Sequence, residues 1–215
     1  MENYINQIRK GIELLPLNYV FVAKDFTNNI DYETARKTLR RLDEREEIKK
    51  IARGYYYKPT FLPIINDYSR PDIESYAKAI ARNMNWRIFP SGNTALNTFG
   101  LSTQVPANYS YISSGRTITY SINANTISFT HRTSRETDLS YITGTLIQAL
   151  KALGSANISD EIINKISKRL SNKEKEIILK ESKMTSTWIY DVIKKICKGE
   201  ERWLLSLNYL MKKEK

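Results

Sequence analysis

The sequence has little of the residue types on which many catalytic and metal sites depend. Its 215 residues include one cysteine, Cys197, and one histidine, His131. A single cysteine excludes an internal disulfide and a cysteine-rich zinc site. The chain also lacks a Gly-rich phosphate loop, an HExxH motif and a Gly-x-Ser-x-Gly motif. We therefore expect a protein that is not an enzyme and that holds no metal ion and no cofactor.

Long apolar runs are absent as well. No segment approaches the roughly 20 apolar residues that a membrane-spanning helix needs. The first residues also contain no apolar core of a signal peptide. Because both signals are missing, we expect a cytoplasmic protein with no membrane partner.

The chain has fewer acidic than basic residues. The chain has 34 Lys and Arg against 23 Asp and Glu, which gives a formal net charge of +11 and a sequence pI near 9.6. The net charge is +3 over residues 1–59, +2 over residues 60–140 and +6 over residues 141–215. This balance favours a polyanionic partner, although the charge is spread along the whole chain.

The stretch from residue 31 to residue 59 contains the clearest functional pattern. Ala35, Leu39 and Leu42 are spaced as one apolar stripe of an amphipathic helix, with Asp31 placed to cap its first turn. At about 100° per residue, cationic side chains fall on the opposite face or its flank, where a DNA major groove could receive them. These cations are Arg36, Lys37, Arg40 and Arg41.

A β-hairpin is expected directly after this helix. The pattern becomes extended between Ile48 and Ala52, Arg53-Gly54 supplies a turn, and a run of three tyrosines follows before Pro59. Lys50 and Arg53 would lie on this hairpin, where they could contact flanking phosphate groups. The sequence thus predicts a hairpin with a basic tip.

The residues before position 31 complete a known order of elements. Apolar residues at helical spacing predict a first helix that ends at Pro16, and Val22 to Thr27 is long enough for a short second helix. Helix, short helix, basic helix and hairpin is the order of a winged helix-turn-helix. We therefore assign residues 1–59 to a winged helix-turn-helix DNA-binding domain.

The rest of the chain is expected to form a second α+β domain over residues 72–215. Residues 60–71 are interpreted as a linker whose apolar side chains pack on the protein. Strand-like runs at 109–113, 117–122 and 127–131 predict a small antiparallel β-meander. Beyond Thr137 helical patterns predict a C-terminal bundle, with later segments around residues 177–179, 188–197 and 203–211.

Two stretches together resemble a known family. They are the wing, Ile51 to Pro59, and the segment from Pro90 to Gly115 that contains Pro90-Ser91-Gly92-Asn93-Thr94-Ala95 and Gly100-Leu101-Ser102-Thr103-Gln104-Val105-Pro106. The combination is similar to the AbiEi-like antitoxins of bacterial type IV toxin-antitoxin and abortive-infection systems, over roughly residues 1 to 135. The resemblance implies a winged helix that represses its own operon and a second domain that opposes a nucleotidyltransferase-like toxin in phage defence.

We therefore expect a DNA-binding transcriptional regulator whose partner is double-stranded operator DNA. The DNA-binding residues are predicted to be Arg36, Lys37, Arg40, Arg41, Lys50 and Arg53. Ser91, Gln104 and Arg116 are polar residues near expected turns and are candidates for contact with a toxin or another partner. A homodimer is expected for a repressor that binds paired half-sites.

Two other functions stay open at the level of sequence. The first is a protein-interaction module whose winged helix does not bind DNA. The second is a metal-dependent nuclease or nucleotidyl-transferring enzyme, for which Glu136 and Asp138 form the acidic pair near the end of the expected meander. His131 and Cys197 lie in strand and helix patterns that favour a structural role over a catalytic one.

Overall fold

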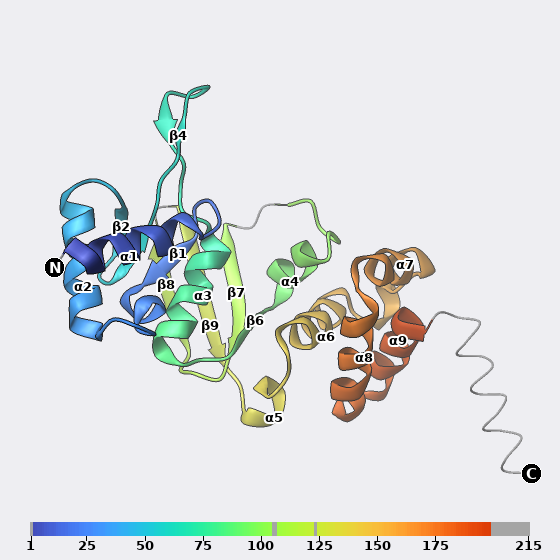
Figure 1. Ribbon diagram of the computed structural model, residues 1–215. Helices are drawn as coiled ribbons and strands as arrows, with labels where there is room; N and C mark the ends of the chain where they lie inside the picture. Colours follow the sequence, from blue (N-terminus) through green and yellow to red (C-terminus); the bar gives the residue numbers. More distant parts are fainter. Residues whose placement is uncertain (1, 105–106, 123, 199–215) are drawn as a thin grey trace, which may run out of the picture. The chain divides into compact units, whose positions relative to one another are not determined.

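The computed structural model describes residues 2–104, 107–122 and 124–198 and shows an α+β protein (Figure 1). This confirms the expected α+β class. The chain divides into two compact units, Met1–Trp86 and Arg87–Lys215, which we call the N-terminal and C-terminal units. In the part of the chain that the structure describes, no helix has the length and apolar character that crossing a bilayer requires.

The N-terminal unit combines three helices, one 3-10 turn and two small sheets. In chain order its elements are α1 (Glu2–Glu13), β1 (Val20–Val22), η1 (Ala23–Phe26), α2 (Tyr32–Glu44), β2 (Lys49–Ala52), β3 (Tyr55–Tyr57), β4 (Phe61–Leu62), β5 (Asp67–Tyr68) and α3 (Ile73–Met84). The expected second helix is thus a single 3-10 turn, and a strand that the sequence did not predict precedes it. That strand escapes detection because Val20, Phe21 and Val22 are all buried and show no alternation.

One apolar core holds α1, α2 and η1 together. Ile8 of α1 and Leu39 of α2 are both fully buried in it. The rest of this core is Ile5, Ile12, Phe21, Ala23, Ile30, Ala35, Leu42, Ile48 and Tyr56. The predicted stripe of Ala35, Leu39 and Leu42 therefore faces inward, as its spacing requires.

The expected hairpin from Ile48 to Lys58 is present. Strand β3 lies at the centre of a three-stranded antiparallel sheet in the order β1-β3-β2, with Lys50 opposite Tyr56 and Val20 opposite Tyr57. Gly54 turns the chain between β2 and β3 with a φ of 85°, a conformation that glycine adopts without steric cost.

Helix α3 belongs to the N-terminal unit, so the expected boundary at residue 71 is wrong. The ring of Tyr76 in α3 meets the ring of Tyr55 edge to face at 5.2 Å, and the backbone N–H of Val20 donates to Ser75 Oγ at 2.7 Å. Side chains alternate along β3, so Tyr56 faces the α1–α2 core while Tyr55 meets α3. Helix α3 therefore covers the face of the sheet opposite to the α1–α2 core.

Residues 60–71 form a projecting hairpin and not a packed linker. Strands β4 and β5 pair antiparallel, with Phe61 opposite Tyr68, and Figure 1 shows β4 in the part of this hairpin that projects from the N-terminal unit. Ile64 in the connecting turn is 99% exposed. The apolar residues that suggested packing are therefore displayed at the surface.

The C-terminal unit contains one mixed sheet followed by helices. Its elements are β6 (Ile88–Pro90), α4 (Gly92–Thr98), β7 (Asn108–Ser113), β8 (Ile118–Ile122), β9 (Asn125–His131), α5 (Ser134–Thr137), α6 (Tyr141–Leu153), η2 (Ser155–Asn157), α7 (Asp160–Arg169), α8 (Asn172–Glu181), η3 (Ser182–Met184) and α9 (Thr187–Lys198). The expected C-terminal helices are thus present as far as Lys198. The expected segment at residues 203–211 lies outside the described residues.

The three predicted strands exist, but they do not form an antiparallel meander. The sheet order is β6-β7-β9-β8, and β7 pairs with β9 in parallel, with Tyr111 opposite Phe129. Strand β8 pairs antiparallel with β9, as expected. The segment 114–117 must therefore cross two strand spacings, about 10 Å, which a tight hairpin turn cannot do. The local turn signal at Ser114-Gly115 did not reveal this crossing.

The helices of the C-terminal unit share one apolar core. Leu150 of α6, Ile166 of α7, Ile178 of α8 and Ile193 of α9 are all fully buried in it. Helix α4 contributes Ala95 to the same core. The helical part of this unit is therefore a bundle, as the sequence predicted.

Candidate nucleic-acid interface

Helix α2 is fixed at its start and on its buried face. Asp31 caps it, since Asp31 Oδ1 accepts a hydrogen bond from the Thr34 backbone N–H at 3.0 Å. The hydrogen bonds from Thr34 also lower the pKa of the Asp31 carboxyl. Because Leu39 and Leu42 are buried on one side, the opposite side of the helix is held toward solvent.

All six predicted cations lie at the surface. The side chains are exposed on α2 and on the β2–β3 hairpin that follows it. On α2 they are Arg36, Lys37, Arg40 and Arg41, and on the hairpin they are Lys50 and Arg53. We call these six side chains the basic surface. Each of the six predicted side chains is therefore open to solvent in the folded chain.

Two arginines of the basic surface have acidic neighbours on the same helix. Arg36 Nη2 lies 2.8 Å from Glu33 Oε2, and Arg40 Nε lies 2.9 Å from Glu44 Oε1. The hydrogen bond from Arg36 lowers the pKa of Glu33. Both pairs are solvent exposed, and exposed pairs of this kind contribute little to stability, so another anion could replace the carboxylate at small cost.

The hairpin is tied to the end of α2. The backbone N–H of Lys50 donates to Asp43 Oδ1 at 3.1 Å, which joins the last turn of α2 to β2. The sequence pattern assigned no role to Asp43. Its position seven residues before Lys50, at the end of the helix, was the available signal for this link. The link fixes the strand that carries Lys50 beside the helix that carries Arg40.

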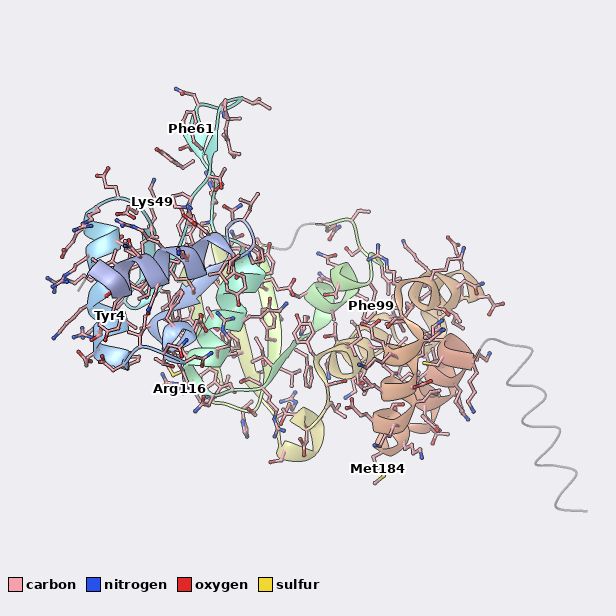
Figure 2. All side chains as sticks on the ribbon, in the orientation of Figure 1. Tyr4, Lys49, Phe61, Phe99, Arg116 and Met184 are labelled. Atoms are coloured by element: carbon pink, nitrogen blue, oxygen red, sulfur yellow. The ribbon has the colours of Figure 1, made fainter. Side chains whose placement is uncertain are left out.

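The sequence pattern also assigned no functional role to Lys49 or to Glu47. The Nζ of Lys49 lies 4.3 Å from the ring centroid of Tyr68 in β5, so the hairpin and the projecting β4–β5 segment meet at this cation–π contact. Figure 2 labels Lys49 and Phe61 on these two segments.

Just before β2, Glu47 accepts from Arg9 of α1, with Arg9 Nε 2.6 Å from Glu47 Oε2. Arg9 therefore neutralises an acid next to the basic surface.

The three candidate partner-binding residues of the C-terminal unit are not brought together. Ser91 lies beside Ser110 in β7, whereas Arg116 follows the far end of that strand. Gln104 lies after α4, where its backbone carbonyl accepts from Asn97 Nδ2 at 2.7 Å. These residues therefore do not make one surface.

Helix α4 begins without a side-chain cap. Ser91 occupies the N-cap position without a side-chain hydrogen bond, and Thr94 Oγ1 accepts from the Ser110 backbone N–H at 2.9 Å. Thr94 thus ties α4 to the sheet and does not cap the helix. Gly100, which follows the C-cap residue Phe99 of α4, has a φ of 63°.

The residues considered for catalysis have structural partners. Asp138 pairs with Arg87, and Glu136 Oε1 lies 3.9 Å from Lys151 Nζ. His131 Nδ1 lies 2.7 Å from the carbonyl oxygen of Gly115. Burial raises the pKa of Cys197 to about 11, so its thiol is a poor nucleophile at neutral pH. Among the described residues there is no group of three or more His, Cys, Asp or Glu that could hold a metal ion.

Comparison with protein families identifies the group to which this chain is related. The model of a family of unknown function, DUF6088, matches residues 7–178. The chain belongs to this family. The match extends from α1 into α8, so it includes the basic surface and a large part of each unit of this DUF6088 protein.

Two other comparisons concern curated proteins and solved structures. No curated protein matches the sequence. Among solved structures, this DUF6088 chain is similar to the crystal structure of the RV2827C protein from Mycobacterium tuberculosis, with a TM-score of 0.39 and 11% sequence identity over 92% of this chain and 77% of that one.

Proposed function

We propose that the N-terminal unit is a winged helix that binds double-stranded DNA, with α2 as the recognition helix and the β2–β3 hairpin as the wing. The main support is that six exposed cations lie on two adjoining elements whose inner faces are buried. An α-helix fits the major groove of B-DNA, and a wing beside it can reach the neighbouring phosphates.

The order of elements also supports this proposal. The chain runs α1, β1, η1, α2, β2 and β3, and β1 pairs with β3 so that the hairpin is anchored to the helical core. A wing attached in this way keeps a fixed position relative to the recognition helix. The six cations then meet DNA as one surface.

The ion pairs on α2 are compatible with DNA binding. Arg36 and Arg40 each exchange an exposed carboxylate for phosphate or a base edge when DNA is bound. The released carboxylates of Glu33 and Glu44 stay near the DNA and repel phosphate. The affinity is therefore set by a net excess of cations, and it falls as salt concentration rises.

The test is DNA binding by the purified full chain, measured by fluorescence anisotropy on the DNA upstream of its own gene. The double variant Arg40→Ala, Arg41→Ala is expected to bind at least roughly tenfold more weakly, since each base contact contributes about 1 to 3 kcal/mol. The slope of log affinity against log salt should fall by nearly one unit for each phosphate that the variant no longer neutralises.

A matched control removes two exposed cations elsewhere. Lys165 and Lys168 lie on α7 of the C-terminal unit, and Lys165→Ala, Lys168→Ala makes the same change in net charge. This control is expected to bind like the wild type. Equal losses in both double variants would show that α2 has no special role, and full affinity in the α2 variant would remove the recognition-helix assignment.

We further propose that the bound DNA is the operator of the chain's own operon and that the protein is an antitoxin. The support is the similarity of the wing and of residues 90–115 to AbiEi-like antitoxins. The functional partner is then a nucleotidyltransferase-like toxin, and the protein acts in the cytoplasm as a regulator without catalysis.

Two measurements test the antitoxin role. A reporter gene behind the upstream DNA should be repressed by the wild type and not by the Arg40, Arg41 variant. Expression of the neighbouring gene should stop growth unless this chain is present. A neighbouring protein that co-purifies in stoichiometric amount, with no repression of the reporter, would favour a protein-interaction module instead.

A further inference from the structure

Exposed apolar side chains are concentrated in two neighbouring segments of the N-terminal unit. Of the eleven large apolar side chains that are exposed in the described residues, two lie between α1 and β1 and five lie in the β4–β5 hairpin. They are Leu14, Leu17, Phe61, Leu62, Ile64, Ile65 and Tyr68. A concentration of this kind marks an interaction surface more often than scattered exposed residues do.

The β4–β5 hairpin, which we call the apolar arm, has a fixed root and a free tip. At the root, Ser69 Oγ accepts from the Thr60 backbone N–H at 2.8 Å, and the Ser69 carbonyl accepts from the Tyr57 hydroxyl at 3.3 Å. At the tip, Ile64 is almost fully exposed. Two-stranded hairpins are only marginally stable in water, so an arm of two-residue strands gains stability when its tip is covered.

A groove lies next to the root of the apolar arm. Its volume is about 420 Å³, enough to receive branched aliphatic side chains. The apolar part of its lining is Ile12, Leu15, Pro16, Leu17, Tyr19, Phe21, Pro59 and Phe61, and its charged residues are Glu13 and Lys58. Because Phe61 belongs to both features, the groove continues into the arm.

We propose that the protein forms a homodimer in which the tip of each apolar arm, Ile64 and Ile65, inserts into the groove of the second copy. A two-fold interface uses the same patch on both chains, and this patch holds both an apolar projection and a cavity lined by apolar and polar side chains. Exchange of the arms covers the apolar side chains of both segments. This homodimer is a property beyond DNA binding, because it assigns to the chain a surface for self-association.

Charge also favours a second copy over nucleic acid as the occupant. No charged residue occurs between Thr60 and Asn66, so the tip offers nothing to phosphate. Asp67 on the arm and Lys58 in the groove have opposite signs, and the proposed exchange of arms pairs them across the two copies, with Glu13 as the other charged residue of the groove lining. The apolar tip fills the groove while this charge pair sets the register.

The experiment measures the mass of the full chain by sedimentation velocity across a wide concentration range, without DNA. The wild type is expected to be a dimer. Ile64→Asp and Leu17→Asp should weaken dimerisation roughly tenfold or more, as expected when an anchor of an interface is removed. Both side chains are exposed in the single chain, so neither change disturbs its core. Met184→Asp, which alters a side chain 75% exposed in the C-terminal unit, should leave the dimer intact.

Mixing and charge exchange test the geometry of the contact. A mixture of Ile64→Asp and Leu17→Asp chains retains one intact arm facing one intact groove, so heterodimers should form where neither variant alone dimerises. Lys58→Asp and Asp67→Lys should each weaken the dimer, and the double variant should restore it.

Several outcomes would overturn this proposal. They are a monomeric wild type, a dimer that Ile64→Asp leaves unchanged, and a mixture that shows no recovery. If the wild type is monomeric and Ile64→Asp binds DNA more weakly than the wild type does, the arm is assigned to nucleic acid instead. Because mass is measured without DNA, failure here leaves the DNA-binding proposal standing, and the Arg40, Arg41 variant should still dimerise.

Discussion

Arg82 of α3 makes a bidentate contact with Asp25 of η1, from Nε to Oδ1 at 2.9 Å and from Nη2 to Oδ2 at 3.0 Å. The same Nη2 donates to the carbonyl of Val20 at 3.0 Å. This arginine therefore joins α3 to both β1 and the turn that precedes α2. The contact explains why the N-terminal unit extends to Trp86 and does not end with the hairpin at residue 59.

The first prediction concerns this contact. Its side chains are only 32% and 22% exposed, so Arg82→Ala should lower the free energy of unfolding by about 1 to 2 kcal/mol. The matched control is Arg87→Ala, since the Arg87–Asp138 pair is 56% and 71% exposed and should contribute at most about 1 kcal/mol. Urea unfolding measures both. Similar losses in the two variants would refute the structural role of Arg82.

The second prediction concerns the acid beside Arg40. Glu44→Gln removes a carboxylate that both holds Arg40 and repels phosphate, so DNA affinity should rise roughly twofold to fivefold, in line with the small energy of an exposed pair. Anisotropy titration at fixed salt measures it. Glu176→Gln on α8 makes the same charge change at an exposed site in the C-terminal unit and should have no effect. Reduced affinity in Glu44→Gln would count against a phosphate-facing Arg40.

The third prediction concerns pH. The hydrogen bond from Arg9 lowers the pKa of Glu47 below its ordinary value of 4.5. Because the folded-state pKa is the lower one, the pair stabilises the fold at pH values above the unfolded-state pKa. This stability is lost as pH falls from about 5 through the folded-state pKa. Glu47→Gln should therefore show a smaller loss of stability than the wild type between about pH 5 and pH 3.

Urea unfolding at several pH values measures this difference, and an NMR titration of the Glu47 side chain gives its pKa directly. An identical pH dependence in the wild type and in Glu47→Gln would show that the pair does not contribute.

The fourth prediction concerns the close approach of α6 to β6. A Cβ at Gly144 would lie 2.5 Å from Cδ1 of Phe89. Gly144→Ala should therefore be destabilising, because overpacking costs about 1 to 3 kcal/mol and the gain in helix propensity is at most about 1 kcal/mol. Thermal unfolding measures the change. In a Phe89→Leu background the same substitution should cost less, and an equal cost in both backgrounds would rule out the steric explanation.

Local physical chemistry allowed much of the N-terminal unit to be predicted. The spacing of Ala35, Leu39 and Leu42 determined which face of α2 is buried, and Asp31 marked its start. Gly54 marked the turn of the hairpin, since glycine tolerates a positive φ. Each of these signals acts within one helical turn or one hairpin, so it can be detected without knowledge of the rest of the chain.

Contacts between residues far apart in the sequence were harder to predict. The parallel pairing of β7 with β9 depends on where the chain crosses the sheet, and the same alternation of side chains would fit an antiparallel pair. The apolar residues around Ile64 and Ile65 suggested packing, because hydropathy alone does not tell a buried segment from a displayed one. Sequence alone also did not indicate that Lys49 meets Tyr68.

By itself, the sequence determined the α+β class, the positions of most helices and strands, and the outward face of the cations on α2, because periodicity and capping are local properties. Only the tertiary structure decided that α3 completes the N-terminal unit, that the C-terminal sheet is mixed, and that the apolar arm projects beside a groove. These features arise from contacts between residues far apart in the chain, whose free energies depend on which surfaces meet and not on the order of residues within any one segment.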